Sequence, residues 1–513
     1  MESVMFASDH SHKGFSFSTL GHRLRSMPML LVLLPFVVGV LLAEHFVVPL
    51  YLVLALFLAS VTLAYISMPR GVVWGYVALS LLSFGYVVSE LRAPNLSMPY
   101  GKEHEMVIEV EGIPSQRDGY RVADGRLVQW CDGKHWHDSD SRVVLWLRCD
   151  SIDNGDRVHM CGRVSEDISR YGDYNRLMHR RGYVGGVGVS NYNVIDVRHS
   201  APVDLQSKAI ARLDEYATDA ASHATVVAMV AGSRHAMPTT LREAYSKTGL
   251  SHLMAVSGLH LGIVLMVVSF MLMPLRLLHG GHRIAALLSI AAIWCYAVMS
   301  GASPSTMRAA IMLSVLQLSL ATSARYNSLN ALAVTVFAML VYRPSYLFDI
   351  SFQLSVTAVF GIVAWGVPLM RAARSWHPLV SGIYKLFVVG AVATLWTLPI
   401  VSHTFDNVPI VGVVVTPCVM LFAYAIVACG ILAVMLPSPV GYPFAIVAEW
   451  AAHIQNIVVE WAADIPFASV AYTMPRWGVV LCYALYAAIT LLCWSRNQKK
   501  VVTLPRYDDY ERP

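Results

Sequence analysis

The strongest constraint in this sequence is a series of long apolar runs separated by short polar segments. A run of about 18 or more apolar residues matches the hydrocarbon thickness of a bilayer. The composition agrees, because 56% of the 513 residues are hydrophobic and only 14% are charged, whereas a typical soluble chain has about 25% charged residues. The sequence therefore predicts a polytopic α-helical membrane protein rather than a water-facing globule.

The apolar runs form two groups, one on each side of a polar segment. The first group comprises residues 29–93, with runs at 29–43, 47–66 and 71–90. The second comprises residues 251–494, with runs at 256–275, 284–300, 307–321, 329–341, 348–370, 384–401, 409–436 and 477–494. A further run, 441–464, is ambiguous because polar residues interrupt it: Glu449, His453, Gln455, Asn456, Glu460 and Asp464. We expect about eleven or twelve spans.

Basic residues between the runs predict the orientation. The tail of residues 1–28 and the turn at Arg70 are basic, which places both on the cytoplasmic side by the positive-inside rule. The third run then exits outward, and the alternation of later runs assigns further basic loops to the cytoplasm, at Arg276, Arg325, Arg371 and Arg374. We therefore expect a second cytoplasmic tail at residues 495–513 and an extracytoplasmic segment after residue 93.

Residues 94–200 form that extracytoplasmic segment, and their composition indicates β-structure. Gly, Asp and Asn turns separate strand-like segments at 106–110, 142–149 and 157–164. About 100 residues suit a five-stranded β-barrel of the OB type, a fold that often binds single strands or sugars; a sandwich fragment fits the same pattern. Three tryptophans could stack on bases or fill the barrel core: Trp130, Trp136 and Trp146.

The cysteines and histidines of residues 94–200 could form a disulfide, but their spacing does not predict a metal site. Cys149 and Cys161 lie on neighbouring predicted strands, and disulfides persist outside the cytoplasm. Cys131 is an alternative partner for either, and three free thiols remain the other interpretation. There is no CxxC pattern, and His135-Trp-His137-Asp138 lacks the downstream ligands of metallohydrolases, so we predict no metal site. No phosphate-binding or dinucleotide motif occurs, so we predict no ATP hydrolysis and no cofactor.

Residues 201–250 are Ala-rich, charged and amphipathic, which predicts helices that lie at the interface or pack against the bundle. Immediately after them comes a polar cluster, Ser251, His252, Ser257 and His260, where an apolar run begins. Polar groups at membrane depth cost free energy unless they meet partners or water. We therefore interpret the cluster as candidate lining of a cavity or channel. Small residues that permit close helix packing are the alternative explanation.

Three further polar clusters lie at the ends of predicted spans. Ser303, Ser305 and Arg308 begin one span, where a cation is disfavoured by the helix dipole, so Arg308 needs a specific partner or an anionic ligand, or snorkels to the headgroups. Gln353 and Ser355 predict interhelical hydrogen bonds. His403 follows a proline and suggests a helix broken at the membrane face. All six residues join the candidate substrate path.

A catalytic interpretation of Ser257 and His260 is the third hypothesis. These two residues are three apart and share a helix face, as an intramembrane serine hydrolase would require. A nucleophile also needs an oxyanion hole, and one helix face offers no obvious donors for it. We therefore expect that the chain is not an enzyme.

Three motifs, in order, resemble the ComEC family of competence proteins. They are Leu241-Arg-Glu-Ala-Tyr-Ser-Lys-Thr-Gly-Leu-Ser-His-Leu-Met-Ala-Val-Ser-Gly-Leu-His-Leu-Gly262, Gly301-Ala-Ser-Pro-Ser-Thr-Met-Arg-Ala-Ala-Ile-Met312 and Phe352-Gln-Leu-Ser355. The segment Tyr174-Asn-Arg-Leu-Met-His-Arg-Arg-Gly182 is also similar to the family. The chain departs from the family at Gly232-Ser-Arg234, where Gly-Asp-Arg is usual, and it resembles the form without a C-terminal β-lactamase-like domain.

The resemblance implies a channel in the bacterial cytoplasmic (inner) membrane that translocates single-stranded DNA into the cytoplasm during natural transformation. It implies single-stranded DNA and the lipid bilayer as partners, a cytoplasmic ATP-driven DNA motor and a periplasmic DNA receptor, and it allows a homo-oligomer. Degradation of the other strand would come from another protein. The alternative from the residues alone is a channel or transporter for another polar or anionic solute.

Overall fold

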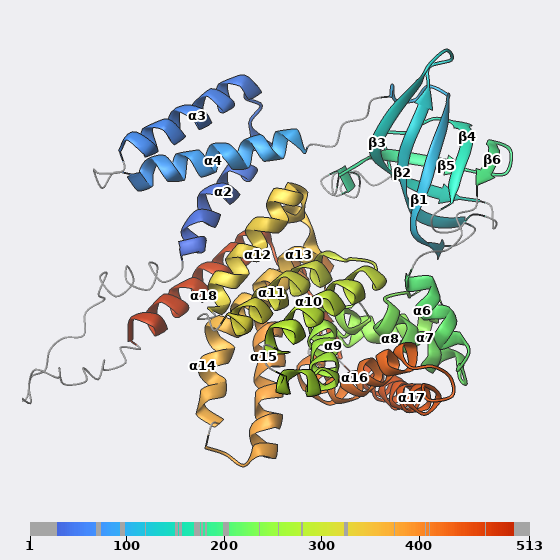
Figure 1. Ribbon diagram of the computed structural model, residues 1–513, viewed down its shortest axis with the longest axis vertical. Coiled ribbons are helices and arrows are strands. Elements are labelled where there is room, and N and C mark those ends of the chain that lie inside the picture. Colours follow the sequence, from blue (N-terminus) through green and yellow to red (C-terminus); the bar gives the residue numbers. More distant parts are fainter. Residues whose placement is uncertain are drawn as a thin grey trace, which may run out of the picture.

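The computed structural model describes most of the chain (Figure 1). The described residues are 28–67, 73–92, 98–117, 120–148, 152, 156–168, 175, 178–179, 182–198, 205–234, 236–254, 256–278, 281–322, 327–373, 375–405, 407–409, 411–466 and 468–496. Three N-terminal helices and a β-sheet domain lie beside a larger bundle of helices (Figure 1).

The N-terminal helices are α2 (Pro28–His45), α3 (Leu50–Ile66) and α4 (Val73–Leu91). The backbones of α2 and α4 touch at a reciprocal pair of glycines. A Cβ at Gly39 would lie 2.0 Å from the Leu82 carbonyl oxygen, and a Cβ at Gly85 would lie 2.2 Å from the Phe36 carbonyl oxygen. Small residues allow such approach in membrane helices, where packing rather than water drives association. These two glycines therefore determine how closely α2 and α4 pack.

The sheet domain contains β1 (His104–Arg117), β2 (Tyr120–Cys131), β3 (Trp136–Leu147), β4 (Arg157–Gly162), β5 (Tyr183–Val189) and β6 (Val194–Arg198). Their order is β5-β3-β2-β1-β4-β6, and all pairs are antiparallel except β3 with β5. Closure would need a ladder between the edge strands β5 and β6. Neither has one in the described residues, where β5 gains only an isolated bridge, Ser165 with Gly186. The sheet is open, so the predicted OB-type barrel is not confirmed.

The register of the sheet bears on the cysteine predictions. Cys131 on β2 and Cys161 on β4 are both cross-strand partners of Glu105 on β1. Two strand spacings, about 9–10 Å, therefore separate them, which exceeds the reach of a disulfide. Cys131 and Cys161 are therefore not bonded to each other. Cys149 lies outside the described residues, so its pairing with the exposed Cys161 stays a prediction.

The hairpin between β2 and β3 accounts for the histidine-rich motif. The Asp132 carboxylate accepts hydrogen bonds from the backbone N–H groups of His135 and Lys134, each at 2.9 Å, and lies 3.2 Å from His137 Nε2. Because these donors, the backbone N–H of His135 first, favour the ionised carboxylate, the pKa of Asp132 is well below its usual range. These side chains therefore stabilise a turn.

The bundle begins with three short helices, α6 (Leu205–Asp214), α7 (Ala220–Ala231) and α8 (Thr239–Lys247). The longer helices follow: α9 (Gly258–Met271), α10 (Gly281–Met299), α11 (Pro304–Ala321), α12 (Ser328–Tyr342), α13 (Ile350–Gly361), α15 (Pro378–Phe405), α16 (Gly412–Met435), α17 (Tyr442–Asp464) and α18 (Arg476–Arg496). A π-helical segment, Ile362–Gly366, joins α13 to α14 (Val367–Met370), and a two-stranded sheet pairs β7 (Asn407–Pro409) with β8 (Ser469–Ala471).

Polar side chains cap the starts of several of these helices. Ser303 caps α11 by accepting from the Thr306 N–H, Asn327 caps α12, and Asp349 caps α13 by accepting from the Phe352 N–H at 3.1 Å. Each cap satisfies an N–H that has no partner inside the helix. The ambiguous segment 441–464 is helical as α17, and α7 is largely buried against α16 and α17 rather than lying at an interface.

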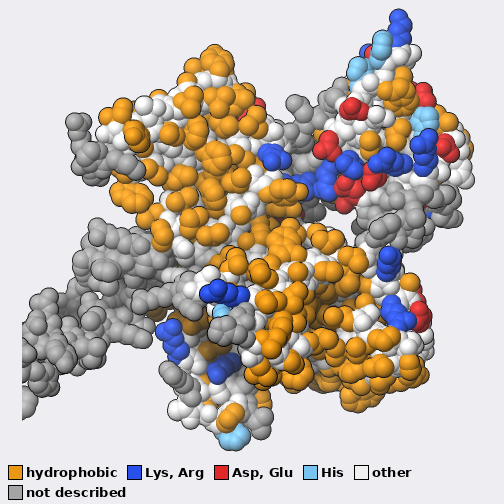
Figure 2. Space-filling view, in the orientation of Figure 1, with side chains coloured by type: hydrophobic (Ala, Val, Ile, Leu, Met, Phe, Trp, Pro, Cys, Tyr) orange, Lys and Arg blue, Asp and Glu red, His pale blue; other side chains and the backbone are white. Residues whose placement is uncertain are grey.

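Seven helices among the described residues are long and apolar enough to cross a bilayer. They are Pro28–His45, Val73–Leu91, Gly281–Met299, Ile350–Ala373, Val380–Phe405, Val414–Met435 and Arg476–Cys493. Apolar side chains cover the helical parts, whereas charged side chains gather on the sheet domain (Figure 2). Such an apolar surface does not suit water, so the chain is a polytopic membrane protein. The total of eleven or twelve spans stays a prediction.

A valine at Gly85 tests the helix contact in the N-terminal group. Gly85→Val places side-chain atoms against the α2 backbone, and we expect a loss of about 1–3 kcal/mol of stability from overpacking. The control is Gly75→Val on the same helix, because a Cβ there meets nothing within 4 Å. Thermal unfolding of the purified protein in detergent measures both, and equal midpoints for the two variants would contradict the contact.

Candidate functional site

The starts of α9 and α11 meet the second turn of α13 inside the bundle and bring several predicted residues together. Thr306, in the first turn of α11, donates to the Val256 carbonyl at 3.2 Å, which ties α11 to the segment before α9. Ser305 Oγ lies 3.4 Å from Ser355 Oγ, which ties α11 to α13. Helix N-termini carry partial positive charge. The first turns of α9 and α11 therefore form an electropositive region, which we name the α9/α11 junction.

Ser257 and His260 contact each other at the start of α9. The Ser257 N–H donates to His260 Nδ1 at 3.1 Å, and Ser257 Oγ lies 2.9 Å from the same nitrogen. This is a capping box in which His takes the place of the usual Glu or Gln. Since Nδ1 accepts a backbone proton, a neutral imidazole carries its own proton on Nε2. That nitrogen is buried and has no partner among the described residues.

Arg308 is the fifth residue of α11 and its side chain is buried. Only 4% of the residue is exposed, so its head does not snorkel to the surface of the bundle. One guanidinium nitrogen, Nη1, donates to the Ser355 carbonyl, and Nη2 lies 3.7 Å from the position of a Cβ at Gly258, the first residue of α9. Its Nε has no partner, and no carboxylate pairs with it in the described part of the chain. Within the described residues, the junction thus contains a buried cation without a counter-ion.

The structure brings six predicted residues to this junction and leaves four elsewhere. The six are Ser257, His260, Ser303, Ser305, Arg308 and Ser355. Ser251 and His252 lie in a short exposed helical turn, where His252 Nδ1 is 3.0 Å from the Gly249 carbonyl. Gln353 donates to the Leu347 carbonyl at 2.9 Å, and His403 Nδ1 is 2.8 Å from the Met474 carbonyl. The contacts of His252 and Gln353 hold nearby turns, and the contact of His403 ties the end of α15 to the segment before α18.

A second polar region, between α7 and α17, was not predicted as a site. Glu449 on α17 is only 5% exposed. Its carboxylate accepts from the Thr218 N–H at 3.0 Å and lies 3.1 Å from His223 Nδ1, while His223 Nε2 is 2.8 Å from Asp214. Glu449 was visible in the sequence as an interruption of an apolar run. Nothing in the sequence indicated that its partners would be Thr218 and His223, which lie within residues 201–250.

The same interface continues deeper as a neutral network. Thr225 and Tyr245 both donate to the Asn456 side-chain oxygen, at 3.1 and 2.9 Å, and Gln455 donates to the Tyr245 hydroxyl at 2.9 Å. All four residues are buried. Because these groups are hydrogen-bonded to one another, the network stabilises the packing of α7 and α8 on α17.

These features define a polytopic membrane protein with a buried cationic junction among its helices. The chain belongs to the competence protein family, the ComEC family, whose sequence profile matches residues 229–497. The matched region begins near the end of α7, contains every residue of the junction and includes α17, whereas Thr218, His223 and Thr225 lie before it.

Curated relatives match parts of the chain. ComE operon protein 3 of Bacillus subtilis is 28% identical over 188 residues, which are 37% of this chain and 23% of the relative. Competence protein ComA of Neisseria gonorrhoeae is 26% identical over 276 residues, which are 50% of this chain and 37% of that protein. An uncharacterised protein of Aquifex aeolicus is 29% identical over 197 residues, 38% of this chain and 43% of its own length. The chain thus covers less than half of each relative, and no solved structure matches it.

Substitutions at His260 separate helix capping from other roles. Gln is a usual residue at this capping position, so His260→Gln keeps an acceptor for the Ser257 N–H, whereas His260→Leu leaves that N–H without one. An unsatisfied buried donor costs about 1–3 kcal/mol. We expect the Leu variant to unfold at a lower temperature and the Gln variant near wild type, measured by thermal unfolding in detergent. Equal losses in both variants would contradict the capping role.

Proposed function

We propose that this protein is a channel in the bacterial inner membrane that translocates single-stranded DNA into the cytoplasm during natural transformation. Membership of the competence family supports the biological process. The observation that supports the transport chemistry is the buried Arg308, a cation held among apolar helices without a carboxylate partner in the described residues.

A buried, unpaired charge is costly to a fold. Removing a charge from water costs several kcal/mol even after the protein relaxes, and one hydrogen bond to a backbone carbonyl compensates for only part of this cost. Such residues in membrane proteins mark substrate and ion pathways. A polyanion that passes the junction would supply the missing negative charge one phosphate at a time.

The neighbours of Arg308 suit an anion as well. The partial positive charge of two helix N-termini and the unpartnered Nε2 of His260 all favour a negative group. A phosphodiester passing here would meet donors and no competing carboxylate in the described part of the junction. Single contacts of this kind hold a strand weakly, which suits passage rather than tight binding.

The remainder of the proposal concerns orientation and partners. With the N-terminus in the cytoplasm, the sheet domain would stand outside the membrane and meet DNA first. No nucleotide-hydrolysis motif occurs in the sequence, so energy would come from a cytoplasmic ATP-driven motor, and a periplasmic receptor would deliver the DNA. The contact between Ser257 and His260 is accounted for by helix capping, and we propose no catalytic role for it.

Deletion of this protein tests the proposed function. We expect that cells lacking it no longer bring labelled DNA into a nuclease-resistant cytoplasmic pool, while growth on ordinary solutes is unaffected. Unchanged DNA uptake would refute DNA translocation. Loss of growth on one anionic solute with normal DNA uptake would instead favour a transporter for that solute.

Neutralising Arg308 tests the junction. We expect Arg308→Gln to reduce DNA uptake about tenfold or more, the effect of about 1.4 kcal/mol on a rate. Because the variant removes an uncompensated buried charge, we expect its thermal stability to be equal to or above wild type. The control is Arg283→Gln, an exposed arginine on α10, which should change neither property. A destabilised Arg308→Gln protein would indicate a purely structural residue.

A further inference from the structure

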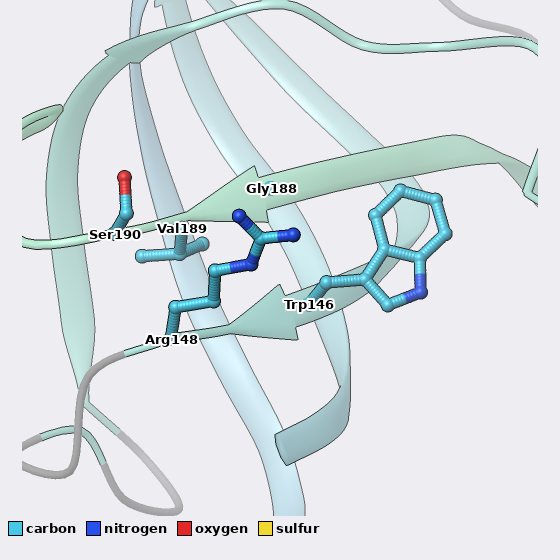
Figure 3. Close-up of a pocket in the computed structure, with 5 residues that line it drawn as sticks. All are labelled: Trp146, Arg148, Gly188, Val189 and Ser190. Carbon is cyan, nitrogen blue, oxygen red and sulfur yellow. The ribbon is translucent and has the colours of Figure 1, made fainter. Parts of the chain in front are cut away.

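The sheet domain has a cavity of its own, separate from the α9/α11 junction. It has a volume of about 290 Å³ and lies where the parallel strands β3 and β5 end, lined by Trp146, Arg148, Gly188, Val189 and Ser190. Trp146 and Arg148 extend from the β3 side on the same face of the sheet (Figure 3). Ligand pockets usually start at about 300 Å³, so this cavity suits one small unit of a ligand. We name it the β3/β5 pocket.

Strand alternation explains which residues share this face, where Trp146 also packs against a small apolar cluster of Val144, Ile168, Met178 and Tyr183. Leu147 and Val189 are cross-strand partners, and both point into the apolar core with 1% exposure. Residues one step away on each strand point to the opposite face, which assigns Trp146, Arg148, Gly188 and Ser190 to one surface. The pocket therefore combines an aromatic ring, a cation and a hydroxyl on the face opposite the main core of the domain.

Glycines of β5 create the space. A Cβ at Gly186 would lie 2.2 Å from the Trp146 ring, so the indole lies directly against the β5 backbone. Two residues further along, a Cβ at Gly188 would meet nothing within 4 Å. Gly inside a strand often marks the close approach of a ligand. Gly186 therefore lets the indole lie against the strand, and Gly188 leaves the adjacent part of the pocket unfilled.

The far end of the pocket is held by Asn193. Its side-chain oxygen accepts from the N–H of Ser190 at 2.8 Å and from the Ser190 hydroxyl at 3.0 Å, and its side-chain nitrogen donates to the Gly188 carbonyl at 3.0 Å. The Arg148 N–H donates to the Val189 carbonyl at 2.8 Å, which continues the pairing beyond β3. These contacts position the backbone from Gly188 to Ser190 beside Arg148, and the Ser190 hydroxyl keeps its lone pairs available as acceptors.

We propose that the β3/β5 pocket binds one nucleotide unit of single-stranded DNA, with the base against Trp146 and the adjoining phosphate at Arg148. Every base has a π-face, so stacking on an aromatic ring tolerates any sequence, as imported DNA requires. Arg matches the geometry of a phosphate through paired N–H groups. The inference rests on the proposed function, since it takes DNA as the ligand, but it assigns the first contact to the sheet domain.

Filling the pocket gives a direct test. Gly188→Val introduces a side chain into the open floor without a clash, and β-branched residues suit strands. We expect the purified full-length protein in nanodiscs to bind a fluorescent ten-residue oligothymidine about tenfold more weakly after Gly188→Val, and similarly after Arg148→Gln, as measured by anisotropy. Arg163→Gln, an exposed arginine of the same domain that does not line the pocket, should retain wild-type affinity.

An abasic strand of equal length and charge separates stacking from charge attraction alone. We expect it to bind the wild type about as weakly as oligothymidine binds Gly188→Val. Equal affinity of the two strands for wild type, or unchanged affinity in both pocket variants, would overturn the inference. DNA uptake by deletion cells tests the proposed function separately. If the pocket proposal is wrong, DNA binding by the pocket variants is unchanged; if the proposed function is wrong, DNA uptake by the deletion cells is unchanged.

Discussion

Polar groups that are removed from water must find partners, and the described part of this chain is organised around that constraint. Helices satisfy their own backbone except at their first and last turns. The starts of α9, α11, α12 and α13 are therefore the places where polar side chains gather, because each needs a cap. Where the starts of α9 and α11 meet α13, capping groups and a buried cation come together in an apolar surrounding, and the candidate site is a consequence of how these helices begin.

The same residues serve both structure and proposed transport at this junction. His260 accepts a backbone hydrogen bond through Nδ1, which assigns the proton to Nε2 and directs that donor into the protein without a partner. Capping thus fixes the tautomer that an anion would require. Arg308 differs, because no carboxylate among the described residues pairs with its charge. Whether a buried polar group has a hydrogen-bond partner therefore distinguishes structural residues from candidate functional residues better than its polarity alone.

How much of the structure could be predicted from the sequence depends on how far apart along the chain the interacting residues are. Apolar runs and the motif order depend on neighbouring residues, and the helices and family agree with them. The sheet was expected, but its open edges depend on which strands pair, and the parallel β3–β5 pair was not foreseen. The α7–α17 network joins residues 231 positions apart, such as Thr225 and Asn456, so no local pattern could reveal it.

The contact between the sheet domain and the helices bears on how a polymer would pass. Gly182, which precedes β5 and has a φ of +88°, leaves space that the Arg343 guanidinium approaches. Arg343 caps the end of α12, and the segment after it leads into α13, the helix whose Ser355 carbonyl binds Arg308. The strand that forms one side of the β3/β5 pocket and the helix that supports the buried cation are therefore linked through one short stretch of chain. A small solute needs only one site, whereas a polymer benefits from two sites that it can occupy at once, because each contact can then stay weak enough to release. Under the proposed function, one DNA strand would contact both sites in turn.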